Sequence, residues 1–223
     1  MLRWLRSIER KIESRLENLG GREWHALEAA RAASGMMIDV CVRPHSGLTL
    51  APNQFFIPFQ DMRKVPAHFE YDVQKLLTEE IGQYGYRILA PVEVHAVGPD
   101  AELSEIAWEW TDVHGRAAWG CAEGVEGPAA GGLWGIPKRG ALIGRGSDAD
   151  VRLPDPEVSR RHLGVKIVGD GRVRLEDLGS HNGTRLEKKI ITQPTVVKAG
   201  KRISLGASVL RIWTLPWIEE DSQ

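Results

Sequence analysis

The sequence contains few cysteines and no long apolar run, and each absence excludes a class of protein. Its 223 residues include two cysteines, Cys41 and Cys121, which lie far apart. No CxxC or CxxC…HxxxH spacing occurs, so we expect neither a zinc site nor thioredoxin-type chemistry, and we interpret both thiols as structural residues of a cytoplasmic protein. The sequence has no run of about 18 apolar residues, so no membrane-spanning helix is predicted. Met1–Glu9 lacks the apolar core of a signal peptide.

Motifs of enzymes and of metal sites are also missing. No GxSxG, HExxH or P-loop motif occurs, and Gly144-Arg145-Gly146 does not continue as GxGxxG. The spacing of Asp148, Asp150 and Asp155 does not match an EF-hand loop. Four histidines share no metal-ligand spacing: His25, His45, His68 and His95. We therefore predict a protein with no catalytic residues, no metal and no cofactor.

Charge is distributed unevenly along a chain whose net charge is −1. Residues 1–112 carry 12 Lys and Arg against 17 Asp and Glu, whereas residues 113–223 carry 17 against 13. The second half is therefore the better candidate for an acidic partner. The acidic first half has no GXXG motif and is unsuited to a phosphate backbone, so no nucleic-acid partner is expected.

Residues 1–112 begin with an amphipathic pattern that predicts a helix. Apolar residues recur at spacings of three and four: Leu5, Ile8, Ile12, Leu16 and Leu19. Gly20-Gly21 ends this helix, and a second helix is expected over about Glu23–Ala33. The basic residues of the first helix leave membrane-surface contact open as an alternative. Interspersed glutamates favour a packed or partner-docking helix instead, with peripheral membrane contact made through a partner.

The remainder of residues 1–112 alternates between predicted strands and one predicted helix. The helix follows Pro66 and carries Phe69, Val73, Leu76 or Leu77, and Ile81 at helical spacing. The predicted strands are Met36–Val42, Phe55–Phe59, Ile88–Ala96 and Ile106–Trp110. Mixed elements over this length predict an α+β domain.

From residue 113 onward, the helical period disappears and turn residues become frequent. Short predicted strands lie at Ala117–Ala122, Leu133–Ile136, Ala141–Ile143, Asp150–Leu153, Gly164–Val168, Val173–Glu176, Thr195–Lys198, Arg202–Leu205 and Ser208–Leu215. This pattern favours an all-β sandwich or barrel over residues 113–217, with a boundary near Asp112–Gly115 and an acidic tail at 218–223. Gly124–Gly132 is interpreted as a hairpin loop inside this domain.

Two predicted loops concentrate groups that hold an anion. The first combines Gly144-Arg145 with Ser159-Arg160-Arg161-His162, and the second spans Asp177–Thr184. A phosphomonoester carries about −1.5 to −2 charges and three acceptor oxygens. An arginine fork, a serine hydroxyl, an asparagine amide and loop N–H groups suit such a ligand. Each residue alone would more often be structural, and only their combination predicts a phosphopeptide site.

These residues carry a resemblance to a known family. Ile143-Gly144-Arg145, Val158–His162, Asp177–Thr184 and Leu205-Gly206 resemble, in order and spacing, the blocks of a forkhead-associated (FHA) domain. The resemblance implies a β-sandwich whose loops bind phosphothreonine peptides without catalysis. It implies phosphopeptide contacts for Arg145, Ser159, Arg160, His181 and Asn182, and loop support from Gly144, His162, Asp177, Gly183 and Thr184.

Residues 1–112 resemble a domain of unknown function that precedes FHA domains in bacterial, actinobacterial-type signalling proteins. The resemblance is carried by Pro52-Asn53-Gln54-Phe55, by Gly85-Tyr86 and by Pro91-Val92-Glu93-Val94, together with the basic and apolar opening helix. It implies an accessory or docking role and no activity.

Together these features predict a phosphothreonine-dependent adaptor in bacterial Ser/Thr kinase signalling. Its partners would be phosphothreonine-containing proteins, either substrates of such a kinase or the kinase itself. The alternatives are a phospho-independent scaffold that acts through residues 1–112 and an enzyme, against which the missing motifs argue.

His181 generates a prediction, because the family usually has Thr or Ser at this position. Histidine gains a proton near pH 6.5 and then donates more strongly to phosphate. We therefore expect phosphopeptide affinity to rise as the pH falls from about 7.5 to 6.5, although protonation of the phosphate, with a second pKa of about 6, acts against this. Binding titrations should show the dependence weakened in His181→Thr. An unchanged dependence in that variant would contradict the prediction.

Overall fold

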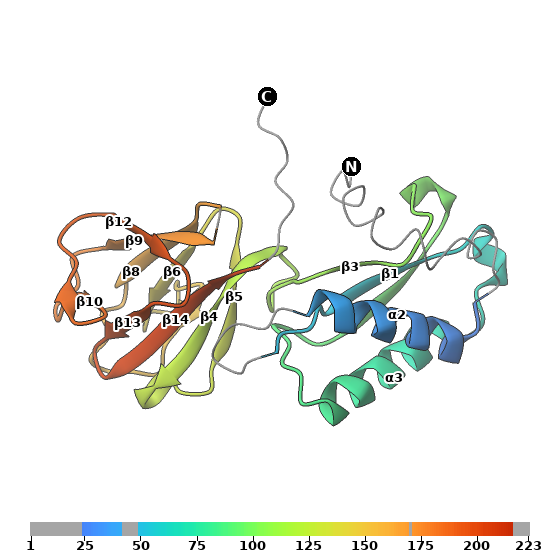
Figure 1. Ribbon diagram of the computed structural model, residues 1–223, viewed down its shortest axis with the longest axis horizontal. Helices are drawn as coiled ribbons and strands as arrows, with labels where there is room; N and C mark the ends of the chain where they lie inside the picture. Colours follow the sequence, from blue (N-terminus) through green and yellow to red (C-terminus); the bar gives the residue numbers. More distant parts are fainter. Residues whose placement is uncertain (1–23, 42–48, 170, 216–223) are drawn as a thin grey trace. The chain divides into compact units, whose positions relative to one another are not determined.

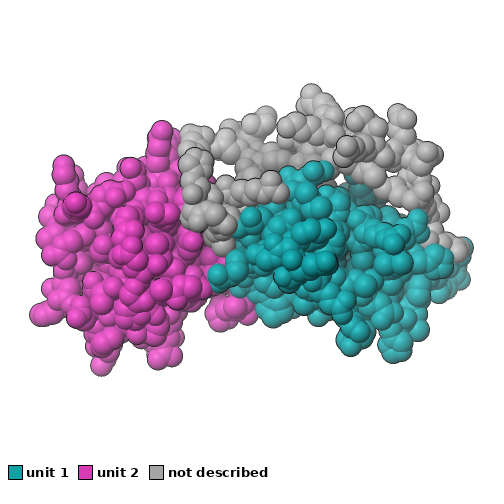
Figure 2. Space-filling model, turned by 60° about the horizontal axis from the view of Figure 1, so that its bottom comes forward, with its two compact units in different colours: residues 1–110, 217–223 teal, residues 111–216 magenta. Residues whose placement is uncertain are grey.

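The computed structural model describes residues 24–41, 49–169 and 171–215 of the chain. These residues fall into two compact units, divided between Trp110 and Thr111. Figure 1 labels the helices and strands of each unit, and Figure 2 colours the two units separately. The helix expected over Leu5–Leu19 and the acidic tail at 218–223 lie outside the described residues. The domain limits 1–112 and 113–217 stay a prediction. No helix within the described ranges is long and apolar enough to cross a membrane.

Two helices of the first unit pack side by side, α2 (Ala26–Val40) and α3 (Phe69–Gln83). The buried residues of α3 recur every four positions, as the sequence predicted: Phe69, Val73, Leu77 and Ile81. The helix ends in a Schellman motif, since the Tyr86 N–H donates to the Ile81 carbonyl and the Gly85 N–H donates to the Gly82 carbonyl. Gly85 has a φ of 66°, a left-handed conformation that favours glycine.

A three-stranded sheet completes the first unit, in the order β2 (Glu93–Val97), β1 (Gln54–Pro58), β3 (Ala107–Glu109). The central strand pairs parallel with β2 and antiparallel with β3. Phe55 and Ile57 of β1 are fully buried. The mixed α and β content of this unit agrees with the predicted α+β class.

The strand predicted at Met36–Val42 is wrong, because Met36–Val40 continue helix α2. The buried positions of α2 follow helical spacing and include Ala29, Ala33 and Met37, whereas Ile38 is largely exposed. Alanine has the highest helix propensity, and the alanine-rich helix runs through Gly35. The strand predicted at Ile88–Ala96 begins only at Glu93, so its first half is also wrong.

The second unit is a sandwich of two sheets, which confirms the predicted all-β class. One sheet has six strands: β11 (Lys189–Ile190), β10 (Thr184–Leu186), β13 (Arg202–Leu205), β14 (Ser208–Thr214), β4 (Ala118–Glu126) and β5 (Leu133–Pro137). The other has five: β12 (Thr195–Lys198), β9 (Arg172–Asp177), β8 (Leu163–Ile167), β6 (Ala141–Gly144) and β7 (Val151–Arg152). Alternate residues of both sheets form one apolar core.

All nine strands predicted in this unit are present, while β10 and β11 were missed. Both are short, and β11 is exposed on both faces, so no alternation marks it. The turn between them contains Glu187 with a φ of 55° instead of the Asn-Gly pair that signals a hairpin. Strand β4 also extends to Glu126, so the hairpin loop predicted at Gly124–Gly132 is shorter than expected.

The strand register places three loops at one end of the five-stranded sheet. Ile143 of β6 lies opposite Leu163 of β8, and Leu163 lies opposite Asp177 of β9. The chain leaves the sheet beyond this row in three segments: 145–150, 153–162 and 178–183. Both loops predicted to hold an anion therefore lie at the same end of the sandwich.

Candidate functional site

Backbone hydrogen bonds join the first loop (145–150) to the second (153–162); the third loop is 178–183. The N–H of Arg145 donates to the Ser159 carbonyl and the N–H of Gly146 donates to the Arg160 carbonyl, each at 3.1 Å. A Cβ at Gly144 would lie 2.1 Å from the Arg160 carbonyl oxygen, a distance that real Cβ atoms do not show. Gly144 is therefore required because the two backbones approach so closely.

Ser159 joins the second loop to the third. Its Oγ accepts a hydrogen bond from the backbone N–H of His181 at 3.0 Å. Because the oxygen acts here as an acceptor, the hydroxyl hydrogen stays available for a ligand. Ser159 is half-buried. The serine predicted to contact phosphate therefore also positions the loop that carries His181 and Asn182.

His162 is fully buried beneath the second loop. Its Nδ1 accepts the backbone N–H of Ser159 at 3.1 Å. This bond requires an unprotonated Nδ1, and hence the neutral tautomer with hydrogen on Nε2. Burial lowers the pKa of His162 below its usual 6.5, and this effect outweighs the opposing charges of Asp177 and Asp155.

Asp177 shapes the start of the third loop. Oδ1 accepts the N–H groups of Gly179 and Ser180, and Oδ2 accepts the hydroxyls of Ser180 and Thr184 at 2.7 and 2.6 Å. Partial burial raises the pKa of Asp177, but hydrogen bonds, led by those from Thr184 and Ser180, outweigh burial and lower it overall. The carboxylate is therefore charged at neutral pH and keeps the loop closed.

Asn182 has a dual arrangement that the sequence did not predict. Its Nδ2 donates to the Glu157 carbonyl at 2.9 Å, so part of the amide holds the third loop against the second. The side-chain carbonyl and the second N–H can still pair with a peptide backbone. Gly183, with a φ of 71°, provides the left-handed turn that follows.

Four of the five residues predicted to contact the phosphopeptide are exposed, Ser159 being half-buried: Arg145, Arg160, His181 and Asn182. Within the described ranges, no hydrogen bond or ion pair holds the guanidinium groups of Arg145 and Arg160. Arg161 differs, because it is paired with Asp148 at 2.9 Å. The three loops thus carry two cationic side chains without a recorded ion pair, on a backbone that hydrogen bonds hold in place.

Sequence reasoning missed two carboxylates that support these loops. Asp155 is buried and accepts hydrogen bonds from Glu157 N–H, Ala207 N–H and Ser208 Oγ, which ties the second loop to the other sheet. Asp150 accepts from Leu142 N–H, Arg116 and Arg139 at the end of the first loop. An Asp in a loop often accepts a hydrogen bond from the backbone N–H two residues later. This Asx-turn tendency is the sequence signal that could have identified Asp155.

Cys121 of the second unit lies in the core. Burial, with a contribution from Glu123, raises the pKa of the Cys121 thiol to about 12, so this cysteine is not a reactive thiolate at neutral pH. Among the residues that the structure describes, no group of three or more His, Cys, Asp or Glu side chains could hold a metal ion.

The lowered pKa of His162 predicts how stability depends on pH. The unfolded chain binds a proton at His162 near pH 6.5, whereas the folded chain binds it only at lower pH. The stability that depends on a neutral His162 is fully present above pH 6.5 and is lost as the pH falls from 6.5 toward the folded-state pKa. Urea denaturation between about pH 5 and 8 should show that the free energy of unfolding falls less with pH in His162→Gln than in the unmodified protein. The exposed His25→Gln is the control, and equal slopes in both variants would contradict the prediction.

Comparison with known proteins identifies the same part of the chain. The profile of the FHA domain matches residues 141–206. FhaA of Mycobacterium tuberculosis is 48% identical over 68 residues, which cover 30% of this chain and 12% of FhaA. The crystal structure of the FhaA FHA domain complexed with the intracellular domain of Rv3910 has 33% identity, a TM-score of 0.37, and coverage of 42% of this chain and 98% of that one.

A second relative is covered over most of its length. The glycogen accumulation regulator GarA of Mycolicibacterium smegmatis is 31% identical over 110 residues, which cover 44% of this chain and 68% of GarA. The chain spans only 12% of FhaA. The matched residues 141–206 lie outside residues 1–112, so the resemblance of the N-terminal part stays a prediction. On the match to the FHA-domain profile and the 31% identity to GarA over 68% of its length, the chain belongs to the family of FHA-domain proteins.

Proposed function

We propose that this protein is a phosphothreonine-peptide-binding adaptor in bacterial Ser/Thr kinase signalling. The observation that carries the proposal is the joining of three loops at Ser159, whose carbonyl accepts the Arg145 N–H and whose Oγ accepts the His181 N–H. These bonds bring an exposed arginine, a serine hydroxyl and an exposed histidine to one end of the sandwich. The FHA resemblance supplies the phosphothreonine preference.

Arg145 is proposed to bind the phosphate. Its guanidinium is exposed and presents a planar set of donors that suits a dianion. Ser159 adds its hydroxyl hydrogen and Arg160 a second positive charge. Because the backbone beneath these groups is held by hydrogen bonds, little ordering is needed on binding, which favours affinity.

Asn182 is proposed to align the peptide backbone. Its side-chain carbonyl and remaining N–H can pair with one peptide unit regardless of the ligand's side chains. Phosphate then provides the required modification and Asn182 provides register. Gly144, His162, Asp177, Gly183 and Thr184 are proposed as supports, a role consistent with their position within the loops.

We place this activity in a domain of residues 113–217, with residues 1–112 as an accessory or docking domain. The adaptor would act without catalysis in the cytoplasm, on phosphothreonine-containing substrates of a kinase or on the kinase itself. The assignment of partners comes from the family resemblance.

Removing Arg145 tests the proposal. Arg145→Ala should weaken binding of a phosphothreonine peptide by about 1.5–3 kcal/mol, the scale of a hydrogen bond to a charged group, which is roughly tenfold or more. Isothermal titration calorimetry with matched phosphorylated and unphosphorylated peptides from a library screen measures this loss of binding free energy.

Arg172→Ala is the matched control, since Arg172 is exposed at the opposite end of β9 from the three loops. It should bind like the unmodified protein, and urea denaturation should show that Arg145→Ala stays folded. Equal binding of both peptides, or full retention of affinity in Arg145→Ala, would defeat the adaptor and favour the phospho-independent scaffold.

A further inference from the structure

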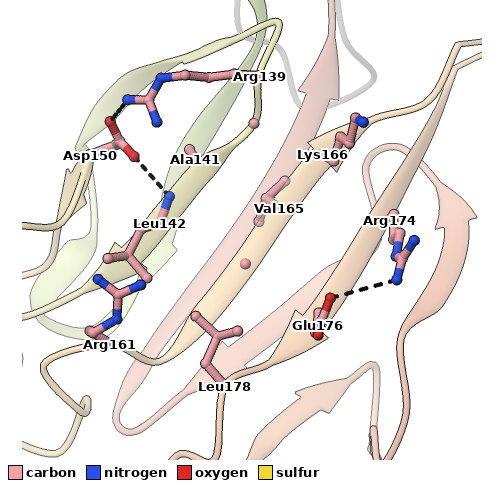
Figure 3. Close-up of a pocket in the computed structure, with 12 residues that line it drawn as sticks. Arg139, Ala141, Leu142, Asp150, Arg161, Val165, Lys166, Arg174, Glu176 and Leu178 are labelled. Carbon is pink, nitrogen blue, oxygen red and sulfur yellow. Dashed lines mark hydrogen bonds and ion pairs between the residues drawn. The ribbon is translucent and has the colours of Figure 1, made fainter.

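A hollow of about 430 Å³ lies on the five-stranded sheet of the second unit, over strands β6, β8 and β9 (Figure 3). Leu142, Gly164 and Glu176 form a row across these strands. Their neighbours along each strand, such as Ile143, Val165 and Leu175, are buried in the core. Side chains of adjacent strand residues point to opposite faces, so this row faces away from the core and toward solvent.

Gly164 gives the hollow its depth. A Cβ at Gly164 would meet Leu178 Cδ2 at 3.7 Å and Glu176 no closer than 3.7 Å, which are ordinary van der Waals distances. Neither steric conflict nor a left-handed φ therefore requires glycine here. Glycine inside a strand weakens it and often marks a position where another molecule approaches closely. The vacant space above Gly164 suits the side chain of a ligand.

The walls of the hollow combine apolar side chains with cations. Leu142 is half-buried, and Leu178 is 39% exposed. Three cations also line the hollow, with Arg161 beside Leu142 and Lys166 and Arg174 on the other side, as Figure 3 shows. An apolar centre with a basic rim is complementary to an apolar residue flanked by acidic ones.

Carboxylates compensate part of this positive charge, because Arg161 is paired with Asp148 at 2.9 Å. Asp150 is engaged by Arg139, Arg116 and the Leu142 N–H. Glu176 lies 3.7 Å from Arg174. Within the described ranges, the structure records no ion pair or hydrogen bond for the exposed Lys166 ammonium. Lys166 is therefore the clearest candidate to bind an acidic group.

The hollow is continuous with the three loops. Arg161 follows Ser159 and Arg160 directly in the second loop, and Leu178 begins the third loop. The two segments are joined there, because the Leu178 N–H donates to the His162 carbonyl at 2.9 Å. A polypeptide held by phosphate at the loops can therefore pass onto this face of the sheet.

We infer that the hollow binds a second segment of the phosphorylated ligand, an apolar residue flanked by acidic residues. This inference rests on the proposed phosphothreonine site. The apolar side chain lies over Gly164 between Leu142 and Leu178, and an acidic residue faces Lys166. Because both segments belong to one polypeptide, binding of the phosphate raises the effective concentration of the second segment.

The test uses three forms of one phosphothreonine peptide with the full chain. The first is a short peptide selected from a library. The second carries, through a Gly/Ser linker at either end, a block of one leucine flanked by glutamates. The third carries a Gly/Ser extension of the same length. Isothermal titration calorimetry gives the affinity of each form and of the unphosphorylated short peptide.

Two variants change the hollow without touching the phosphate groups. Gly164→Leu fills it, and Lys166→Glu reverses its exposed charge. Lys188→Glu is the matched control, an exposed lysine in the turn between β10 and β11 of the other sheet. All three should bind the short phosphopeptide within about twofold of the unmodified protein, since exposed charges contribute little at a distance.

We expect the acidic block to improve affinity about tenfold over the Gly/Ser extension in the unmodified protein and in Lys188→Glu. The gain should fall below about twofold in Gly164→Leu and Lys166→Glu, and should shrink as salt is added. No gain in the unmodified protein, or a full gain in both hollow variants, overturns the inference. If the short phosphopeptide binds no better than its unphosphorylated form, the proposed function itself fails, and the inference fails with it.

Discussion

Ser159 makes three hydrogen bonds on which the arrangement of the loops depends. Its N–H donates to His162 Nδ1, its carbonyl accepts the Arg145 N–H, and its Oγ accepts the His181 N–H. One residue thus fixes the spacing of the loops that follow β6, β7 and β9. The side chains that face solvent, including the Arg145 guanidinium, are carried on a backbone that is already ordered before a ligand arrives.

Two carboxylates extend this constraint into the sandwich. Asp177 closes the third loop by accepting four hydrogen bonds, and buried Asp155 connects the second loop to the turn that precedes β14. Each would leave buried or half-buried donors unsatisfied if removed, at a cost of about 1–3 kcal/mol per group. The proposed anion-binding end therefore depends on anionic residues that lie beneath it and hold its loops in place.

The β class of the second unit could be predicted from sequence because its signals are local. Short alternating runs identified nine strands, and motif spacing predicted that the segments carrying Arg145, Ser159 and Asn182 are loops that lie close together. Strands β10 and β11 could not be predicted, since both are short. β10 gains its order from pairing with β13, and the exposed β11 gains its order from pairing with β10. The second role of Asn182 and the support from Asp155 depend on contacts between distant residues, which no local pattern records.

In the first unit, local signals were less reliable. The alternation of Ile38 and Val40 favoured a strand, but burial of Ala29, Ala33 and Met37 on one face selects a helix over the same residues. Tertiary packing decided between two patterns that the sequence allows. Gly164 is a different case. Neither steric conflict nor backbone conformation requires glycine there, so this glycine marks a feature of the surface and not of the backbone.

If the three loops together form one phosphate site, a phosphorylated ligand must perturb all of them at once. An amide NMR titration with a phosphothreonine peptide and its unphosphorylated form tests this most directly. We predict large, phosphate-dependent shifts at Arg145, Ser159, Arg160 and His181, with the amides of β5 unaffected. Shifts that are the same for both peptides, or that leave Arg145 and Ser159 unperturbed, would contradict the account.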